Sequence, residues 1–313
     1  MIFKTLETDK NFLGIEPKFS NYRSSKVVIL PVPYEHTTSY GVGTKLGPRA
    51  ILDASHYVEF YDEETERELH VELGIATLKP LEFESGKGGA RVHEKAIKLS
   101  YDVVRELLAE EKFVVTLGGE HTIAIAPIKA HEEKYGRVDG GFSILHLDAH
   151  SDLRQSYEGT KYSHACFMAR VCEFVDPGKI VQVGIRAQCK EEAEFIREKG
   201  IHTFYAYEIR EGKYRSMRED WGDFVIEKLA ENVYVTFDVD CFDPSIMPAT
   251  GTPEPNGLYW HEVTKLFRKL GQKKTIVGFD VVELAPIKGL HHADLTAAKL
   301  VYKLLNYAFQ TRE

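Results

Sequence analysis

The sequence has few cysteines and no pattern that would pair them or hold a structural zinc ion. The four cysteines form no CxxC pair and show no zinc-ribbon spacing, so we expect reduced thiols. The chain also lacks a run of about 18 apolar residues, and its charged start, MIFKTLETDKNF, contains no apolar segment of a signal peptide. These absences predict a cytoplasmic protein without a membrane partner. The cysteines are Cys166, Cys172, Cys189 and Cys241.

A block of basic residues interleaved with aromatic ones is also missing. Lys and Arg number 40 against 48 Asp and Glu, a formal charge of −8, which argues against nucleic acid as a partner. No stretch has the composition of a linker between domains. We therefore interpret residues 1–313 as a single domain, with residues 1–25 as an N-terminal arm that packs on the surface or on another subunit.

Apolar runs of strand length alternate with segments of helical periodicity along most of the chain. Continuous apolar strands between helices are typical of a parallel sheet covered on both faces, a three-layer α/β/α fold. The charge run 62–72 is interpreted as a solvated turn and the segment 84–89 as a break. Strands are expected over 26–34, 73–78, 113–117, 142–147, 180–185, 202–207, 233–237 and 275–282. Helices are expected over 48–61, 90–112, 123–135, 191–199, 216–231, 260–270 and 294–309.

Polar clusters follow four of the expected strands at their carboxyl ends. Ligands of open α/β sheets bind outside the carboxyl ends of the strands. If these strands are parallel, the four clusters share one rim of the sheet. The clusters are LGGEHT after 113–117, DAHSD after 142–147, DVDCFDP after 233–237 and VELAP after 275–282.

The DAHSD segment carries two carboxylates and an imidazole at alternating positions. In an extended segment, Asp148, His150 and Asp152 would point to one face. Two buried carboxylates repel each other and take up protons unless a cation lies between them, because an uncompensated buried charge is strongly unfavourable. A bound metal ion is the simplest explanation.

The strand-end clusters together offer two imidazoles and four carboxylates, more than one small cation needs. Four negative charges balance two divalent ions, and oxygen-rich ligation with some nitrogen favours Mn²⁺ over a structural Zn²⁺. Water between two such ions loses a proton near neutral pH and becomes a hydroxide nucleophile. The candidate ligands are His121, Asp148, His150, Asp152, Asp238 and Asp240.

Simpler structural roles compete for the isolated polar residues. His121, taken alone, would more often be a satisfied loop or core histidine. Asp243 precedes a proline and suits a turn, and the doublet of His291 and His292 suits a solvated or capping position. Alternating acids at two strand ends, in contrast, have no common structural explanation.

GGEHT, LDAHSDL, FDVDCFDPSIMPATGTPEP and DVVELAP resemble the successive metal and substrate motifs of the ureohydrolase family, which includes arginases and agmatinases. The resemblance extends from about residue 27 to residue 305, with the motifs in order. It implies the arginase-like three-layer α/β/α fold with a central, mostly parallel sheet of about eight strands. It also implies two Mn²⁺ per subunit on the six candidate ligands, and hydrolysis of a guanidine to urea and an amine. Members are commonly trimers or hexamers, so we expect a homotrimer or homohexamer.

The same resemblance assigns catalytic roles to Asp148, to His164 in YSHACF and to Glu283 in VELAP. It implies that His164 shuttles a proton to the leaving amine and that Glu283 holds the guanidinium. A carboxylate can bind a planar guanidinium through two hydrogen bonds, and an imidazole can supply a proton at neutral pH. Without the resemblance, His164 would be interpreted as the start of a helix.

The motifs favour agmatine as the small-molecule guanidine substrate, hydrolysed to putrescine and urea in polyamine biosynthesis. TPEPNGL resembles the TPEPGGL of agmatinases, with Asn256 in place of a glycine, and EGTKYSHA resembles prokaryotic agmatinases. Residues 153–155 and 187–189 lack the side chains with which arginases hold the α-carboxylate and α-amino groups of arginine. Arg154 could bind a substrate carboxylate if it faces the site. N1-aminopropylagmatine, guanidinobutyrate, arginine and guanidine therefore stay as alternatives.

Two other classes of protein share some of these features. A deacetylase-like amidohydrolase would use a single zinc ion with a histidine doublet beside it, but the doublet at 291–292 is far from DAHSD in the sequence. A non-catalytic metal-binding protein would bind Mn²⁺ without turnover. Since no expected ligand is missing, the sequence favours an enzyme.

Overall fold

In the computed structural model, residues 3–83, 90–217 and 219–311 are described. The strands of these ranges form one eight-stranded sheet with the order β2-β1-β3-β8-β7-β4-β5-β6, and the pairings within it are parallel. The predicted parallel sheet is therefore confirmed. The strands are β1 (Val27–Val32), β2 (Ile75–Thr77), β3 (Phe113–Gly118), β4 (Phe142–Leu147), β5 (Ile180–Ile185), β6 (His202–Tyr205), β7 (Asn232–Asp238) and β8 (Thr275–Val282).

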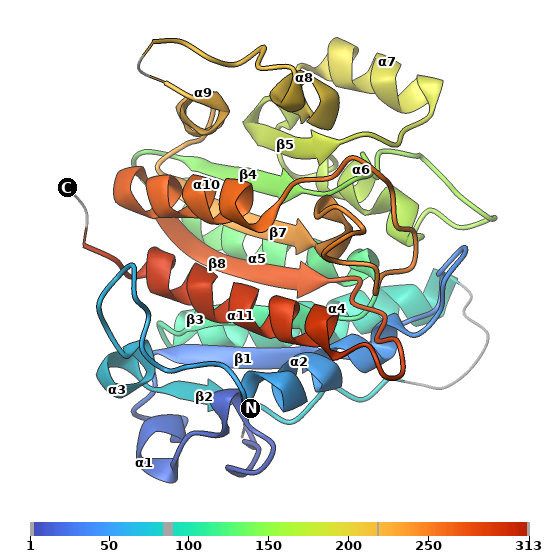
Figure 1. The fold of residues 1–313 in the computed structure, drawn as a ribbon. Helices are drawn as coiled ribbons and strands as arrows, with labels where there is room; N and C mark the ends of the chain where they lie inside the picture. Colours follow the sequence, from blue (N-terminus) through green and yellow to red (C-terminus); the bar gives the residue numbers. More distant parts are fainter. Residues whose placement is uncertain (1–2, 84–89, 218, 312–313) are drawn as a thin grey trace.

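Helices cover both faces of this sheet, as the three-layer prediction requires (Figure 1). One layer contains α2, α9, α10 and α11, the other contains α4, α5 and α6, and α8 packs beside β5 and β6 at one edge. The longer helices are α2 (Gly47–Ser55), α4 (Ala90–Ala109), α5 (Ile125–Tyr135), α7 (Lys190–Lys199), α9 (Trp221–Glu227), α10 (Trp260–Lys273) and α11 (His291–Ala308). The short ones are α1 (Pro17–Ser20), α3 (Leu69–Leu73), α6 (Phe167–Val171) and α8 (Ala206–Arg210).

Burial explains why these segments take these forms. Every residue of β1, β3, β4, β5 and β7 is buried, which suits continuous apolar strands covered on both faces. Helix α10 is amphipathic and buries one apolar stripe against the sheet, formed by Val263, Leu266, Phe267 and Leu270. Two apolar layers thus enclose the sheet and leave its carboxyl edge for polar residues.

Several predicted element boundaries differ from the structure, and three of them illustrate why. The strand predicted over 202–207 ends at Tyr205, where α8 begins. The helix predicted over 216–231 is limited to α9, because the Asp220 carboxylate accepts the Gly222 N–H and caps the helix there. The helix predicted over 48–61 ends at Ser55. The predicted break at 84–89 lies outside the described residues.

The charge run 62–72 is not simply a solvated turn, which corrects another prediction. Asp62 is fully buried, and its carboxylate lies 2.9 Å from Nζ of the equally buried Lys303 in α11. Residues 69–73 form α3. The N-terminal arm is also more than a surface layer, since Phe12 and Ile15 belong to the main apolar core.

Two further observations concern membrane-spanning helices and the cysteines. In the described ranges, no helix combines the length and the apolar content that crossing a bilayer would require. The four cysteines are free thiols, as expected from their spacing.

Candidate active site

The carboxyl ends of β3, β4, β7 and β8 place the predicted polar clusters at one edge of the sheet. His121 begins the 3-10 turn η3 (His121–Ala124) after β3, and Asp238 is the last residue of β7. Asp240 lies in the turn η6 (Val239–Cys241), and Glu283 directly follows β8. Because β3-β8-β7-β4 are neighbours in the sheet, segments far apart in the sequence meet here.

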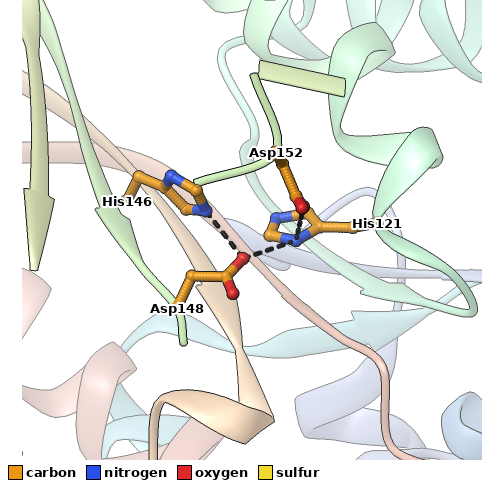
Figure 2. Close-up of side chains that lie close together, drawn as sticks. All are labelled: His121, His146, Asp148 and Asp152. Atoms are coloured by element: carbon orange, nitrogen blue, oxygen red, sulfur yellow. Dashed lines mark hydrogen bonds and ion pairs between the residues drawn. The ribbon is translucent and has the colours of Figure 1, made fainter. Parts of the chain in front are cut away.

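One group of ligand atoms surrounds Nδ1 of His121. This nitrogen lies 3.1 Å from Asp148 Oδ2, 3.3 Å from Asp238 Oδ2 and 3.5 Å from Asp152 Oδ2. All four side chains are buried. Figure 2 shows His121 beside Asp148 and Asp152, which follow β4. An imidazole nitrogen among three carboxylate oxygens is a typical donor set for a divalent cation.

A second group surrounds His150 and shares one residue with the first. His150 Nδ1 lies 3.0 Å from Asp240 Oδ2 and 3.5 Å from Asp148 Oδ1. Asp148 therefore directs one oxygen to each group. The ligand atoms of His121, His146, Asp148 and Asp152, and those of Asp148, His150 and Asp240, lie close enough together to hold a metal ion in each set. A carboxylate that links two donor sets is what a two-ion centre requires.

The DAHSD residues converge for a reason other than the one predicted. Strand β4 ends at Leu147, so residues 148–152 form a loop, not an extended strand with alternating faces. Asp152 has a φ of 53°, in the left-handed region that non-glycine residues seldom adopt. Backbone strain of this kind concentrates at functional sites, where the surrounding structure holds it in place.

The electrostatics of the cluster favour the binding of positive charge. Burial, together with the negative charge of Asp148, raises the pKa of Asp152 well above its ordinary value. Burial and the neighbouring Asp240 do the same to the pKa of Asp238. Burial opposes ionisation of Asp148 too, but the adjacent imidazoles of His121 and His146 hold its pKa well below the usual range. Bound cations would replace the protons that Asp152 and Asp238 otherwise retain.

The tautomer of His121 suits metal binding. Thr236 Oγ1 donates its hydrogen to Asp280 Oδ1 at 2.8 Å, so it accepts one from His121 Nε2, 2.9 Å away. The Nδ1 lone pair is then free, and this buried nitrogen makes no hydrogen bond within the described part of the chain. Tyr234 also donates to Asp280, at 2.8 Å. These contacts fix the ligand orientation that a metal ion needs.

His146 also lies in the cluster, and the sequence analysis missed it. Its Nε2 is 2.8 Å from Asp148 Oδ2 (Figure 2), and Gln182 Nε2 donates to its Nδ1 at 3.1 Å. Since Nδ1 accepts, Nε2 carries the hydrogen and donates to Asp148. His146 lies in β4, two residues before Asp148, so extending the alternation of the DAHSD residues back into the strand could have indicated it.

Glu283 lies against the first ligand group. The His121 backbone N–H donates to Glu283 Oε1 at 2.6 Å, and Glu283 has a φ of 65°. Burial, followed by the charges of Asp238 and Glu120, raises the pKa of this carboxyl well above its ordinary value. A cationic group beside it would favour the ionised form.

His164 borders the same cavity as Glu283 but is not protonated at neutral pH. Burial, reinforced by the nearby His150, lowers the pKa of His164 to about 4. The sequence analysis expected an imidazole that can supply a proton at neutral pH. In this structure the ring is neutral and must first receive the proton that it passes on.

Two adjoining cavities lead away from the cluster. The first, of about 160 Å³, is bordered by Asp152, Asp238, His164 and Glu283. Arg154 borders both this cavity and a second one of about 250 Å³. The second cavity is also lined by Gln188, Glu192 and Glu254. The Arg154 guanidinium lies 5.1 Å from the centre of the Tyr157 ring, and its Nε lies 3.9 Å from Glu192 Oε2. Arg154 thus faces the site.

The predicted structural residues lie apart from the cluster. Asp243 is a turn carboxylate, as predicted, because its oxygens accept the N–H groups of Ser245 and Gly257 at 3.0 Å. His291 and His292 are exposed at the start of α11. They line a cavity of about 800 Å³ between α2 and α11, which is bordered by none of the clustered ligands.

Comparison with known proteins gives a consistent result. The model of the Arginase family matches residues 25–306. A relative from Synechocystis sp., named N(1)-aminopropylagmatine ureohydrolase, is 39% identical over 95% of this chain and 94% of its own length. A Bacillus cereus agmatinase is 35% identical over 97% of this chain and 98% of its own. The crystal structure of an agmatine ureohydrolase of Thermoplasma volcanium superposes with a TM-score of 0.80, at 29% identity, covering 98% and 95% of the two chains.

Proposed function

The chain belongs to the arginase family of ureohydrolases, and on that premise we propose that it hydrolyses agmatine, or an N-substituted agmatine, to urea and an amine. Its sequence is close to those of prokaryotic agmatinases, and it is a hydrolase of guanidino C–N bonds. One observation carries the proposal: two ligand groups share Asp148, directly beside the buried carboxyl of Glu283.

The proposed metal centre holds two Mn²⁺ per subunit. His121, Asp148, Asp152 and Asp238 would hold one ion, and Asp148, His150 and Asp240 would hold the other. When bound, the ions supply a hydroxide nucleophile at neutral pH. As the residue common to both groups, Asp148 would contribute one carboxylate oxygen to each.

The proposed roles of Glu283 and His164 follow from their positions. Glu283 would accept hydrogen bonds from the planar guanidinium and orient its carbon toward the ligand cluster. The His121 N–H and the left-handed backbone hold the carboxylate in place for this. His164, neutral at rest, would take up a proton and deliver it to the nitrogen of the leaving amine.

A specific observation favours N1-aminopropylagmatine as the second candidate substrate. The second cavity adds space beyond the metal cluster, and its carboxylates, Glu192 and Glu254, would attract further ammonium groups of a longer substrate. The relative named for this substrate is 39% identical. We propose that Arg154 contacts the substrate tail at the boundary of the two cavities. A tail that ends in a carboxylate, as in guanidinobutyrate, would bind to the same guanidinium.

Urea release tests the proposed function directly. We expect urea from agmatine or N1-aminopropylagmatine with Mn²⁺ supplied, at rates well above those for arginine, guanidinobutyrate and guanidine. An Asp148→Asn variant, assayed in parallel, controls for contaminating activity, and Ni²⁺ replaces Mn²⁺ in a second series. No urea from any of these substrates would contradict the proposal. Full activity with one metal ion per chain would instead favour a single-zinc amidohydrolase, and Mn²⁺ binding without turnover would favour a non-catalytic protein.

We also propose that the chain forms a homotrimer or homohexamer in the cytoplasm and works as a single domain. Exposed apolar side chains beside the cavity between α2 and α11 support association. Tyr57 and Leu46 are 82% and 55% exposed there, and Leu295 lies on the facing helix. Both ligand groups rest on one sheet, which supports the single domain.

A further inference from the structure

Glu120, in the GGEHT motif, is fully buried beside the cluster but contributes no ligand atom to either group. Its Oε2 accepts the backbone N–H groups of His36 and Thr37, both at 2.7 Å. Its Oε1 accepts the hydroxyl of Thr37 at 2.9 Å. Three hydrogen bonds therefore fasten the segment after β1 to the loop after β3.

Thr37, held in this way, also contacts His164. The His164 backbone N–H donates to Thr37 Oγ1 at 3.0 Å, and the ring Nδ1 lies 3.3 Å from the same oxygen. On the other side of the ring, Ser39 Oγ lies 3.4 Å from Nε2. Two hydroxyls from one segment thus contact both ring nitrogens.

The direction of these hydrogen bonds determines the tautomer of His164. A threonine hydroxyl has one hydrogen, and Thr37 donates it to Glu120. Thr37 Oγ1 can therefore only accept from the ring, so Nδ1 must carry the hydrogen. The lone pair is then on Nε2, next to Ser39, which borders the same cavity as Asp152, Asp238 and Glu283.

We propose that Glu120 is a positioning residue that fixes the orientation and the Nδ1–H tautomer of His164 through Thr37. The neutral ring can then receive a proton only at Nε2, on the side of the cavity, and release it from there to the leaving amine. With the other tautomer, the lone pair would face Thr37 and Nε2 could not accept. The catalytic consequence rests on the function proposed above, whereas the tautomer does not.

The kinetics of matched variants test whether this positioning of His164 contributes to turnover. Thr37→Val keeps the side-chain shape without the hydroxyl, and we expect kcat to fall roughly 10- to 100-fold, part of the 10²–10⁴ that general acid–base catalysis contributes. KM should stay within about threefold and metal content should stay unchanged, because Thr37 is not a ligand. Thr37→Ser, which keeps the hydroxyl, should restore most of kcat. Glu120→Gln should lower kcat as Thr37→Val does. If Glu120→Gln fails to fold, the kcat of Thr37→Val tests the proposal by itself.

A double-mutant cycle separates action through His164 from a general structural effect. In a His164→Asn background, Thr37→Val should cause no further loss of kcat, because the group that it positions is absent. An equal fold-loss in both backgrounds would overturn the proposal. So would a Thr37→Ser variant as slow as Thr37→Val.

Solid-state NMR of the [¹⁵N]histidine-labelled protein reads the tautomer without any assay of activity. The His164 signals, assigned by their loss in His164→Asn, should show a protonated Nδ1 and an unprotonated Nε2 near neutral pH. Thr37→Val should weaken this preference. A protonated Nε2 in the parent protein would overturn the inference. If no guanidine releases urea, the proposed function fails, and the NMR result still decides the tautomer.

Discussion

Asp238 carries a testable part of the proposed metal centre. One of its oxygens lies 3.3 Å from His121 Nδ1, and the other accepts the Asp240 N–H at 2.8 Å. An amide in place of the carboxylate removes the negative charge but keeps the shape. After dialysis, we expect Asp238→Asn to have lost at least one metal ion per chain relative to the parent, as measured by inductively coupled plasma mass spectrometry. We also expect it to release urea at least about 100-fold more slowly. Asp243→Asn, at a turn, is the control and should retain both ions; parental metal content and activity in Asp238→Asn would contradict the assignment.

His164 should matter for turnover and not for metal binding. Its ring nitrogens contact Thr37 and Ser39, which are not candidate ligands, and its neutral ring borders the cavity. We expect His164→Asn to bind as much metal as the parent and to lose about 10²- to 10⁴-fold in kcat on agmatine. His292→Asn, an exposed position on α11, should change neither quantity. An unchanged kcat in His164→Asn would remove its assigned role.

At the scale of single residues, the sequence indicated the groups with unusual spacing and missed those hidden in apolar strands. Five of the six candidate ligands stand out because charged or imidazole side chains alternate at strand ends, whereas His121 is indicated only together with the other clusters. Thr236, Asp280 and Gln182 lie inside strands whose neighbours are almost all apolar, where a lone polar residue gives no sign of its partner. The low pKa of His164 could not be predicted either, since it depends on burial by distant segments.

Among the connecting elements, the loops after β5 and β7 are joined by Arg186. Its guanidinium donates to the backbone carbonyls of Asp240 at 2.7 Å, Glu254 at 2.8 Å and Pro255 at 3.0 Å. We expect Arg186→Met to leave these acceptors unpaired, lower the free energy of unfolding by about 1–3 kcal/mol and weaken Mn²⁺ binding through Asp240. Urea denaturation and Mn²⁺ titration measure the two effects.

Two comparisons make the test of Arg186 specific. Arg186→Lys keeps the charge without the planar fork and should recover only part of the stability. Arg197→Met, an exposed arginine on α7, should leave stability and metal affinity unchanged. If Arg186→Met matched Arg197→Met in both measurements, the loops would not depend on this side chain.

The packing of α5 on the sheet predicts a sensitivity to acid. His131 is buried in α5, its Nδ1 donates to the Pro127 carbonyl at 2.7 Å, and burial lowers its pKa from 6.5 to about 4. Because the folded pKa is the lower one, the unfolded chain takes up the proton first, and stability falls as the pH drops from about 6.5 toward 4. Between pH 7 and 5 this single group should remove about 2 kcal/mol from the free energy of unfolding.

Chemical denaturation of the chelator-treated protein at both pH values measures that loss. His131→Phe should show a smaller difference between pH 7 and pH 5 than the parent, by about 2 kcal/mol. His261→Gln, an exposed histidine on α10, is the control and should keep the parental difference. An unchanged pH dependence in His131→Phe would show that another group is responsible.

At the scale of elements, apolar runs predicted strands well and helix ends poorly. The predicted ranges 142–147 and 275–282 coincide with β4 and β8. The strand predicted over 202–207 was too long at its end, because neither Ala206 nor Tyr207 interrupts an apolar run. Helix α9 begins at a capping carboxylate whose hydrogen bond appears only in three dimensions.

For the whole molecule, the exposed apolar residues between α2 and α11 predict assembly. We expect light scattering after size exclusion to give three or six times the chain mass of 35.6 kDa. Tyr57→Asp places a charge on this surface and should lower the measured mass. Tyr207→Asp, at a 53% exposed position on α8, should leave it unchanged. A monomeric parent protein would contradict the expectation.

The strand order also constrains how the site can form during synthesis. Strand β8 is the last strand in the chain, yet it is the strand that joins β2-β1-β3 to β7-β4-β5-β6 in the sheet. His121 follows β3 on one side, whereas the other candidate ligands follow β4 and β7 on the far side. A growing polypeptide that has not reached residue 282 cannot close this gap. The complete centre can therefore form, and hold metal ions on both ligand groups, only after β8 has been synthesised and has joined the two halves of the sheet.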